Sequence, residues 1–297
     1  MSTPVSPVPK LLTTPIEPNA AARGAPLPRR DQSVYATAFR RFEVAVATSC
    51  GAQHASNEDA HSALGGPGRL FVVADGVGGG AMAQTASRLL VAQLHDALEA
   101  EPIDAESVRA AMLEADRAIA GTIARVTDRP GAATVAMCAP VDVFGARWLV
   151  AWVGDCRLYR VAPGAERGLD LLTRDDTFAH LGETPPPGGS PDDPARMVGN
   201  GAVAGANVAL HELARGEILA LCSDGVHKFV EAADWCRLFA RPLPLARICD
   251  ELIALARGNG SKDDATVVLL QRLPPALPGL RWGGRSDGPA GHGRRTR

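Results

Sequence analysis

Residues 70–80 read Leu-Phe-Val-Val-Ala-Asp-Gly-Val-Gly-Gly-Gly. The apolar run at 70–74 is typical of a short strand buried on both faces. The run stops at Asp75, and glycines follow. A carboxylate at the mouth of a buried strand is unfavourable unless a positive group lies against it, and glycine lets the backbone approach that group closely. Asp75 and Gly76 therefore indicate either an ordinary turn or part of a metal or phosphate site.

The composition of the 297-residue chain limits the classes of protein to which it can belong. Hydrophobic residues make up 46% of the chain and aromatic residues only 4%, so we expect a large core built from Ala, Val and Leu. The formal net charge of -2 gives no reason to expect nucleic acid or an acidic membrane as a partner.

Cysteine usage and hydropathy bear on the compartment. The 6 cysteines are scattered and include no Cys-x-x-Cys pair, which favours buried thiols in a reducing compartment over a disulfide framework. No apolar run approaches the roughly 18 residues of a membrane span. The N-terminus lacks the basic-then-apolar pattern of a secretion signal. We therefore expect a cytoplasmic protein with no membrane segment.

Composition divides the chain into three parts. Residues 1–36 are rich in Pro, Thr, Ser and Ala, which predicts a disordered N-terminal arm. Residues 274–297 are rich in Pro, Gly and Arg and predict a disordered basic tail. The folded body is then one domain at 37–273.

The folded body has more expected strands than expected helices. Helices are expected in pairs, at 81–99 with 105–126 and at 234–239 with 243–257. Strands are expected at 42–48, 70–74, 133–139, 146–153, 157–161, 169–172, 217–222 and 265–271. Because strands and helices do not alternate, the pattern favours a layered α+β fold over a βαβ fold. The Pro-, Gly- and Asp-rich residues 175–207 are expected to form a long irregular surface segment.

Acidic residues recur where these strands begin or end. Each one taken singly is explained by a turn, but several acids abutting apolar strands indicate that they converge. They are, in chain order, Glu58, Asp59, Asp75, Asp155, Asp224, Asp263 and Asp264. Converging carboxylates repel one another unless cations lie between them.

The ligand types suggest which cations these would be. Oxygen ligands without an accompanying His or Cys set point to Mg²⁺ or Mn²⁺ rather than zinc. When two such ions share one bridging carboxylate, they can hold a water in position and deprotonate it for attack on phosphorus.

A series of short motifs then stands in order along the chain. The series resembles that of the metal-dependent protein phosphatases, the type 2C serine/threonine phosphatases, in their compact bacterial form, over about residues 40–272. The motifs are Asn-Glu-Asp at 57–59, Asp-Gly-Val-Gly-Gly at 75–79, Gly-Ala-Ala-Thr at 131–134, Gly-Asp-Cys-Arg at 154–157, Leu-Thr-Arg-Asp-Asp at 172–176, Ser-Asp-Gly at 223–225 and Gly-Ser-Lys-Asp-Asp-Ala-Thr at 260–266.

The resemblance implies a four-layer α-β-β-α sandwich, in which two antiparallel sheets are flanked by helix pairs. It also implies a centre with two Mn²⁺ or Mg²⁺ ions. In that centre Asp75 bridges both ions, the carbonyl of Gly76 binds one, and Asp224 and Asp263 complete the other.

The remaining acids have implied roles as well. Glu58 and Asp59 would hold metal-bound waters or orient the metal ligands. Asp155 matches the position that helps to bind a third, weaker ion. The implied activity is hydrolysis of phosphoserine or phosphothreonine by a water that bridges the two ions, with no phosphoenzyme. Its partners would be phosphorylated proteins, the substrates of a serine/threonine kinase.

The chain departs from the family pattern at His54, where members usually carry an arginine that binds the substrate phosphate. An imidazole grips phosphate less well than a guanidinium fork. His54 is then either a loop residue with no role, or a catalytic residue that binds phosphate or donates a proton to the leaving oxygen.

Other departures occur nearby. Asp264 stands where Asn is usual, and either tightens metal binding or faces solvent. Asp176 replaces a histidine, and no consequence is predicted. Cys156 replaces a serine of nearly the same shape, and Arg157 is expected to form a structural salt bridge. Because 175–207 corresponds to the family's mobile flap, substrate choice is expected to reside there.

Two alternatives to a protein phosphatase remain open. One is a hydrolase of small phosphate esters. The other is a pseudophosphatase that binds phosphoproteins or a regulatory partner without turnover. The acids at 75, 224 and 263 argue for activity, and the missing arginine argues for the pseudophosphatase.

Overall fold

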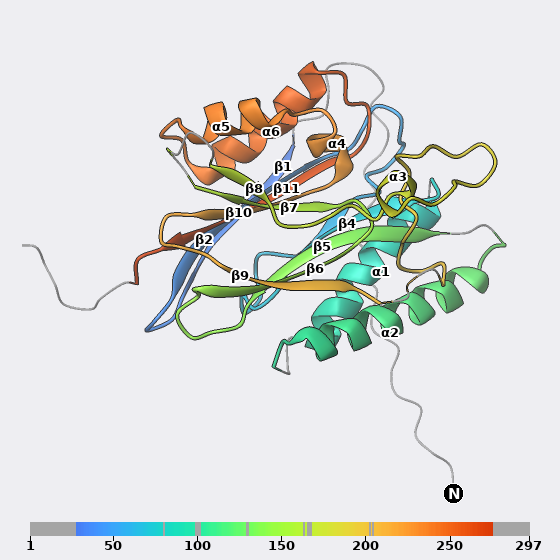
Figure 1. Ribbon diagram of the computed structural model, residues 1–297, viewed down its shortest axis with the longest axis horizontal. Helices are drawn as coiled ribbons and strands as arrows, with labels where there is room; N and C mark the ends of the chain where they lie inside the picture. Colours follow the sequence, from blue (N-terminus) through green and yellow to red (C-terminus); the bar gives the residue numbers. More distant parts are fainter. Residues whose placement is uncertain are drawn as a thin grey trace, which may run out of the picture.

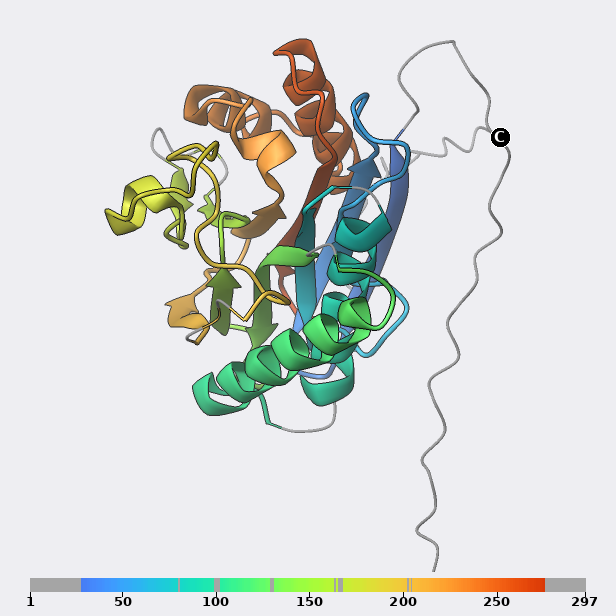
Figure 2. The same cartoon turned by 90° about the vertical axis from the view of Figure 1, so that its right-hand side faces the viewer.

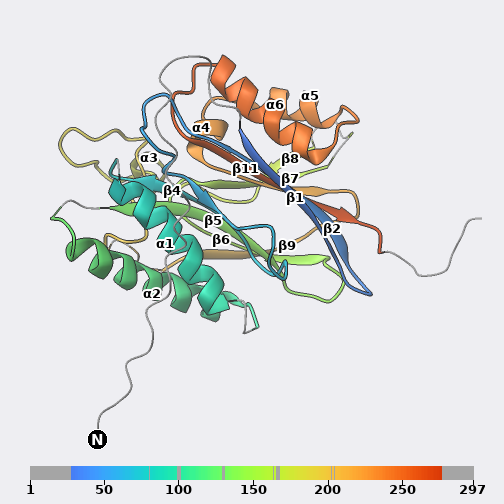
Figure 3. The same cartoon turned by 180° about the vertical axis from the view of Figure 1, so that it is seen from behind.

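Two antiparallel β-sheets lie face to face, and helices cover the outer side of each (Figure 1). The computed structural model describes residues 28–275 apart from 80, 99–101, 129–130, 163, 165–167, 202 and 204. The layers keep the same order after a quarter turn (Figure 2) and from behind (Figure 3). The predicted α+β class and four-layer sandwich are confirmed.

Every pairing between neighbouring strands is antiparallel in both sheets of the described chain. The first sheet has the order β1 (Arg29–Ala36), β2 (Arg41–Ser49), β11 (Ala265–Leu273), β10 (Ile218–Cys222), β7 (Arg157–Val161) and β8 (Leu169–Leu171). The second sheet has the order β3 (Ala60–His61), β4 (Phe71–Val77), β5 (Ala132–Pro140), β6 (Arg147–Val153) and β9 (Asn207–Glu212).

The helices pack in pairs on the outer faces, as expected. The helices α1 (Ala81–Leu98) and α2 (Ala105–Ala124) cover the second sheet. The helices α5 (Ala232–Phe239) and α6 (Leu245–Gly258) cover the first. Of the two single-turn helices, α3 (Phe178–Leu181) lies outside these layers, and α4 (Asp224–His227) packs against α6 and β11.

Strand alternation explains why both faces of the central strands are apolar. Along β4, Phe71 and Val73 pack between the sheets, whereas Val72 and Ala74 pack against the helices on the outer face. A strand with two buried faces needs apolar residues at successive positions. The continuous apolar run that precedes Asp75 is therefore a consequence of the sandwich.

The predicted boundary of the folded body at residue 37 is wrong. Residues 29–36 form the edge strand β1, which pairs along its length with β2. Tyr35 lies in this strand, and its ring centroid is 5.4 Å from that of Phe42 and 5.6 Å from that of Phe71. The strand was missed for two reasons. The residues before it are rich in proline, and most side chains of β1 face solvent, so the strand shows no apolar pattern. Of the arm predicted at 1–36 and the tail predicted at 274–297, residues 1–27 and 276–297 lie outside the described residues.

The segment 175–207 is irregular, as expected, but it is not confined to the surface. Val198 is fully buried and pairs with Ala133 of β5 in an isolated bridge. Asp176 is also buried, and its Oδ2 accepts hydrogen bonds from the backbone N–H of Gly154 at 3.1 Å and from Nδ2 of Asn207 at 2.9 Å. The segment is thus anchored to the second sheet at several points.

Among the described residues no helix is long and apolar enough to cross a membrane.

The packing of Tyr35 gives a test of the corrected boundary. Tyr35→Ala should lower the free energy of unfolding by about 1–3 kcal/mol, because it removes a half-buried ring from an aromatic cluster. Val34→Ala on the exposed face of the same strand should change it by less than about 0.5 kcal/mol. Urea denaturation measures both values, and equal effects of the two substitutions would contradict the assignment of β1 to the core.

Candidate metal centre

At one end of the sandwich, the layer between the sheets changes from apolar to polar. Continuing the inward-facing positions along the strands gives Thr48 on β2, Asp75 on β4, Thr134 on β5 and Thr266 on β11. The register makes Asp75 the direct partner of Thr134, and Thr48 the partner of Thr266. The hydroxyls of Thr48 and Thr266 are 2.7 Å apart. Polar side chains from both sheets therefore meet where the apolar core ends.

Four carboxylates gather at this polar end. Burial raises the pKa of Asp75 well above its usual range, and the charges of Asp224, Asp59 and Asp155 raise it further. The carboxyl groups of Asp75 and Asp224 share a hydrogen bond. Burial likewise raises the pKa of Asp59 to about 8 and that of Asp155 to about 6. The structure therefore brings together acids that the sequence places far apart.

A cation compensates part of this negative charge. The Nζ of Lys228 lies 2.8 Å from Oδ2 of Asp224 and 3.1 Å from Oδ2 of Asp155. Burial raises the pKa of Asp224, but the Lys228 ammonium outweighs that effect and the pKa is lowered. Sequence reasoning missed Lys228, although its spacing of four residues from Asp224 places both on one side of a helical turn.

Two oxygens of the acid cluster have no hydrogen-bond partner. They are Oδ1 of Asp59 and Oδ1 of Asp224, and both are buried. Buried carboxylate oxygens ordinarily have partners. Converging carboxylates with raised pKa values and unpartnered oxygens form the ligand set that Mg²⁺ and Mn²⁺ prefer. The residues present thus fit the predicted divalent ions.

Hydroxyl groups orient part of this set. Oγ of Ser223 donates to Oδ2 of Asp59 at 2.7 Å, and the Thr266 side chain also hydrogen-bonds to Asp59. Ser223 directly precedes Asp224, so one short segment supplies both a candidate ligand and a hydroxyl that holds a neighbouring acid. Only the position of Ser223 inside the Ser-Asp-Gly motif could have indicated this from the sequence.

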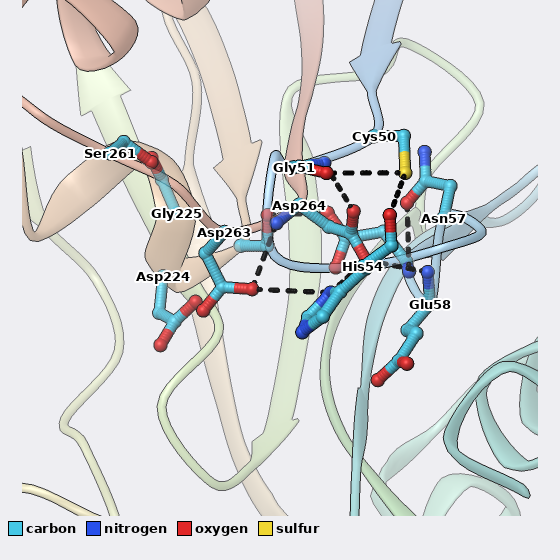
Figure 4. A network of polar contacts seen from close by, with 12 residues as sticks. Cys50, Gly51, His54, Asn57, Glu58, Asp224, Gly225, Ser261, Asp263 and Asp264 are labelled. Atoms are coloured by element: carbon cyan, nitrogen blue, oxygen red, sulfur yellow. Dashed lines mark hydrogen bonds and ion pairs between the residues drawn. The ribbon is translucent and has the colours of Figure 1, made fainter. Parts of the chain in front are cut away.

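Asp263 lies at the more exposed side of the centre. Figure 4 shows its carboxylate between Asp224 and the His54 ring. Burial raises its pKa, and the charge of Asp224 raises it further. The structure therefore places Asp263 beside Asp224, as the predicted ligand set requires, whereas Glu58 lies on the far side of His54 in the same view.

Asp264 does not face solvent, which corrects one of the two expectations for it. Its carboxylate is buried. Oδ1 accepts the backbone N–H of Gly51 at 2.7 Å, and Oδ2 accepts the N–H of Glu58 at 2.6 Å and Nδ1–H of His54 at 2.9 Å. These donors occupy the Asp264 oxygens, so Asp264 holds the loop 51–58 in place.

His54, Asp263 and Asp264 also offer ligand-type atoms within 4.8 Å of one another. Because Asp264 already accepts three N–H groups, we interpret the trio as a hydrogen-bonded group and not as an ion site. Burial lowers the pKa of His54, but the hydrogen bond to Asp264 outweighs this effect and the pKa is raised. With Nδ1 engaged, Nε2 is the ring nitrogen left for another contact.

Close backbone approaches explain the glycines of the motifs. A Cβ on Gly225 would lie 1.8 Å from the carbonyl oxygen of Asp264, and one on Gly76 would lie 2.3 Å from that of Ala83. Real Cβ atoms do not come this close, so only glycine fits at either position. The Gly76 carbonyl therefore lies on a segment whose path is sterically fixed.

Residues around the turn after β6 have structural roles. Arg157 forms a forked ion pair with Asp175, with Nε 2.9 Å from Oδ1 and Nη2 2.7 Å from Oδ2. The expectation of a structural salt bridge is confirmed. The buried Sγ of Cys156 lies 3.2 Å from Oγ1 of Thr134. Both contacts hold the turn that carries Asp155.

Comparison with known proteins agrees with this geometry. A family model described as protein phosphatase 2C matches residues 46–260. The serine/threonine protein phosphatase PstP of Mycobacterium tuberculosis is 31% identical over 230 residues, which are 74% of this chain and 43% of PstP. The chain thus spans less than half the length of this curated relative.

Solved structures match the fold over most of the chain. The catalytic domain of PstP in complex with 2 manganese ions superposes with a TM-score of 0.65 at 27% identity, over 78% of this chain and 98% of that domain. The PPM Ser-Thr phosphatase MsPP of Mycobacterium smegmatis, in complex with cacodylate, superposes with a TM-score of 0.64 at 25% identity, over 77% of this chain and 97% of that one.

The raised pKa values predict how stability depends on pH without metal. Folding raises the pKa of Asp59 from 3.8 to about 8, so between these values the folded chain binds a proton that the unfolded chain has lost. This group's contribution to stability is therefore present at low pH and is lost as the pH rises to about 8. In EDTA, the free energy of unfolding should fall across this range.

Urea denaturation at several pH values measures this dependence. Asp59→Asn should make it less steep, because the amide does not titrate and only the other raised acids, Asp75 and Asp155, still contribute. Saturating Mn²⁺ should stabilise the protein most at high pH, where the ion no longer competes with protons. An equal stabilisation by Mn²⁺ at both ends of the range would contradict the assignment.

Proposed function

The chain belongs to the protein phosphatase 2C family, and we propose that it is a metal-dependent serine/threonine protein phosphatase. The observation that carries this proposal is the buried acid cluster with its unpartnered carboxylate oxygens at the end of the two sheets. Its relatives include a phosphatase whose catalytic domain was solved with 2 manganese ions.

We propose that Asp75, Gly76, Asp224 and Asp263 hold two divalent ions, Mn²⁺ or Mg²⁺. Such ions, when bound, act as Lewis acids on a phosphate ester and lower the pKa of water. The chain's own part is to fix the ligands. β4 delivers Asp75, the turn into α4 delivers Asp224, and the residues before β11 deliver Asp263.

In this proposal Asp59 and Glu58 do not bind the ions directly but hold metal-bound waters or orient the ligands. Asp59 is held through Oδ2 by Ser223, so its free Oδ1 is available to accept a hydrogen bond from a water that the ions orient. The backbone of Glu58 is clamped on both sides, since its N–H donates to Asp264 and its carbonyl accepts Oγ–H of Ser87 at 2.5 Å. The clamp fixes the Glu58 side chain near the site.

His54 replaces the family's arginine as the proposed contact to phosphate. Its Nδ1–H is tied to Asp264, which fixes the ring and leaves Nε2–H for a phosphate oxygen or for the leaving oxygen. Asn at 264 has only one acceptor oxygen and could not accept all three N–H groups there. The two departures from the family pattern therefore complement each other.

The proposed substrates are proteins carrying phosphoserine or phosphothreonine, made by a serine/threonine kinase in the same compartment. We propose the cytoplasm as that compartment, because the free thiols of Cys138, Cys156 and Cys222 are buried and unpaired. The anchored segment 175–207 is the proposed determinant of substrate choice. The proposed role of the protein is in signal transduction, where it removes the phosphate groups that the kinase adds.

Hydrolysis of a phosphothreonine peptide tests the proposal. Phosphate release should require Mn²⁺, should stop in EDTA, and should fall by roughly 100-fold or more in Asp75→Asn, because a metal ligand is lost. Lys262→Ala, which removes an exposed lysine, serves as a control and should retain the wild-type rate. Mn²⁺ binding without any phosphate release would instead favour the pseudophosphatase.

The role of His54 has its own test. His54→Ala should raise KM for the peptide by roughly tenfold, because a hydrogen-bond donor to phosphate is lost. His211→Ala, on β9, is the matched control and should leave KM unchanged. Asp264→Asn should also raise KM, and Asp264→Asn combined with His54→Arg should recover it. Unchanged kinetics in His54→Ala would remove this residue from the site.

A further inference from the structure

Lys228 occupies the space between two carboxylates of the acid cluster. Its Nζ is 2.8 Å from Oδ2 of Asp224 and 3.1 Å from Oδ2 of Asp155. The Asp155 side chain is only 4% exposed, so water solvates it poorly and the Lys228 ammonium compensates its negative charge.

The backbone holds Lys228 in this place. It follows the single turn α4, and its N–H donates to the carbonyl of Asp224 at 3.1 Å. The preceding residue contacts Asp155 as well, because Nε2 of the buried His227 imidazole lies 2.8 Å from the carbonyl oxygen of Asp155. Residues 227 and 228 therefore bind both the backbone and the side chain of Asp155.

This arrangement competes with a cation at the same carboxylates. Asp155 is the residue whose position implied a third, weaker ion, and Asp224 is a proposed ligand of the main pair. A divalent ion between them would need the oxygens that Lys228 now occupies, and the fixed ammonium would repel it. Asp75 and Asp263 make no ion pair with Lys228 in the described structure, so the main pair keeps its ligands.

We propose that Lys228 is a built-in cation that takes the place of a third metal ion between Asp155 and Asp224. The proposal rests on the two-ion centre proposed above. Lys228 is a positioning residue: it orients the two carboxylates without contacting substrate. The chain would then bind two Mn²⁺ ions and remain insensitive to a third, even at high metal concentration.

Mn²⁺ stoichiometry measured directly on the full chain tests this. Equilibrium dialysis up to millimolar free Mn²⁺, followed by elemental analysis, should give two ions for wild type. Lys228→Ala should gain one further, weaker ion, because two carboxylates lose their cation. Lys228→Arg should keep two ions, since the charge is retained, and so should Lys262→Ala, which removes an exposed lysine near the site.

The double variant Lys228→Ala with Asp155→Asn should return to two ions, which assigns the additional ion to Asp155. Three ions bound by wild type, or no gain in Lys228→Ala, would overturn the inference while leaving the two-ion centre intact. Failure of wild type to bind any Mn²⁺ would overturn the proposed function itself. Far-UV circular dichroism of each variant shows that it is folded before its ions are counted.

Discussion

The burial of several carboxylates in one place is the constraint on which this molecule depends. At the end of the layer between the sheets, burial raises the pKa values of Asp59, Asp75 and Asp155, and the charge of Asp224 raises all three further. Water cannot solvate them there, so protons or cations must compensate their charge. No feature of the apolar core requires these acids. We therefore attribute their presence, despite their cost to the metal-free fold, to the ions that we propose they bind.

The sandwich brings these acids together because its inward-facing positions converge. Apolar residues fill the space between the sheets until the strands reach the polar end, where Thr48, Thr134 and Thr266 replace them. The two sheets supply different parts of the centre, with Asp75 from one and Asp224 from the turn after a strand of the other. Helix pairs on the outer faces pack against both sheets and support the strands.

The convergence of the acids was predictable from the sequence, because Asp75, Asp155 and Asp224 each come at the end of an apolar strand. The edge strand β1 was not predictable, since its mostly exposed residues show no buried face. The partners of Asp264 and Lys228 were not predictable either. Both depend on contacts between segments far apart in the sequence, such as Asp264 with Gly51 and Lys228 with Asp155. Local pattern contains no information about such long-range pairs.

A crystal structure with Mn²⁺, using the anomalous signal of manganese, tests the central claim most directly. The account predicts two peaks, both in contact with Asp75, with Asp224 and Asp263 at one of them and the Gly76 carbonyl at the other. It also predicts that the space between Asp155 and Asp224 holds the Lys228 ammonium. Peaks confined to the His54, Asp263 and Asp264 trio, or no peak near Asp75, would contradict it.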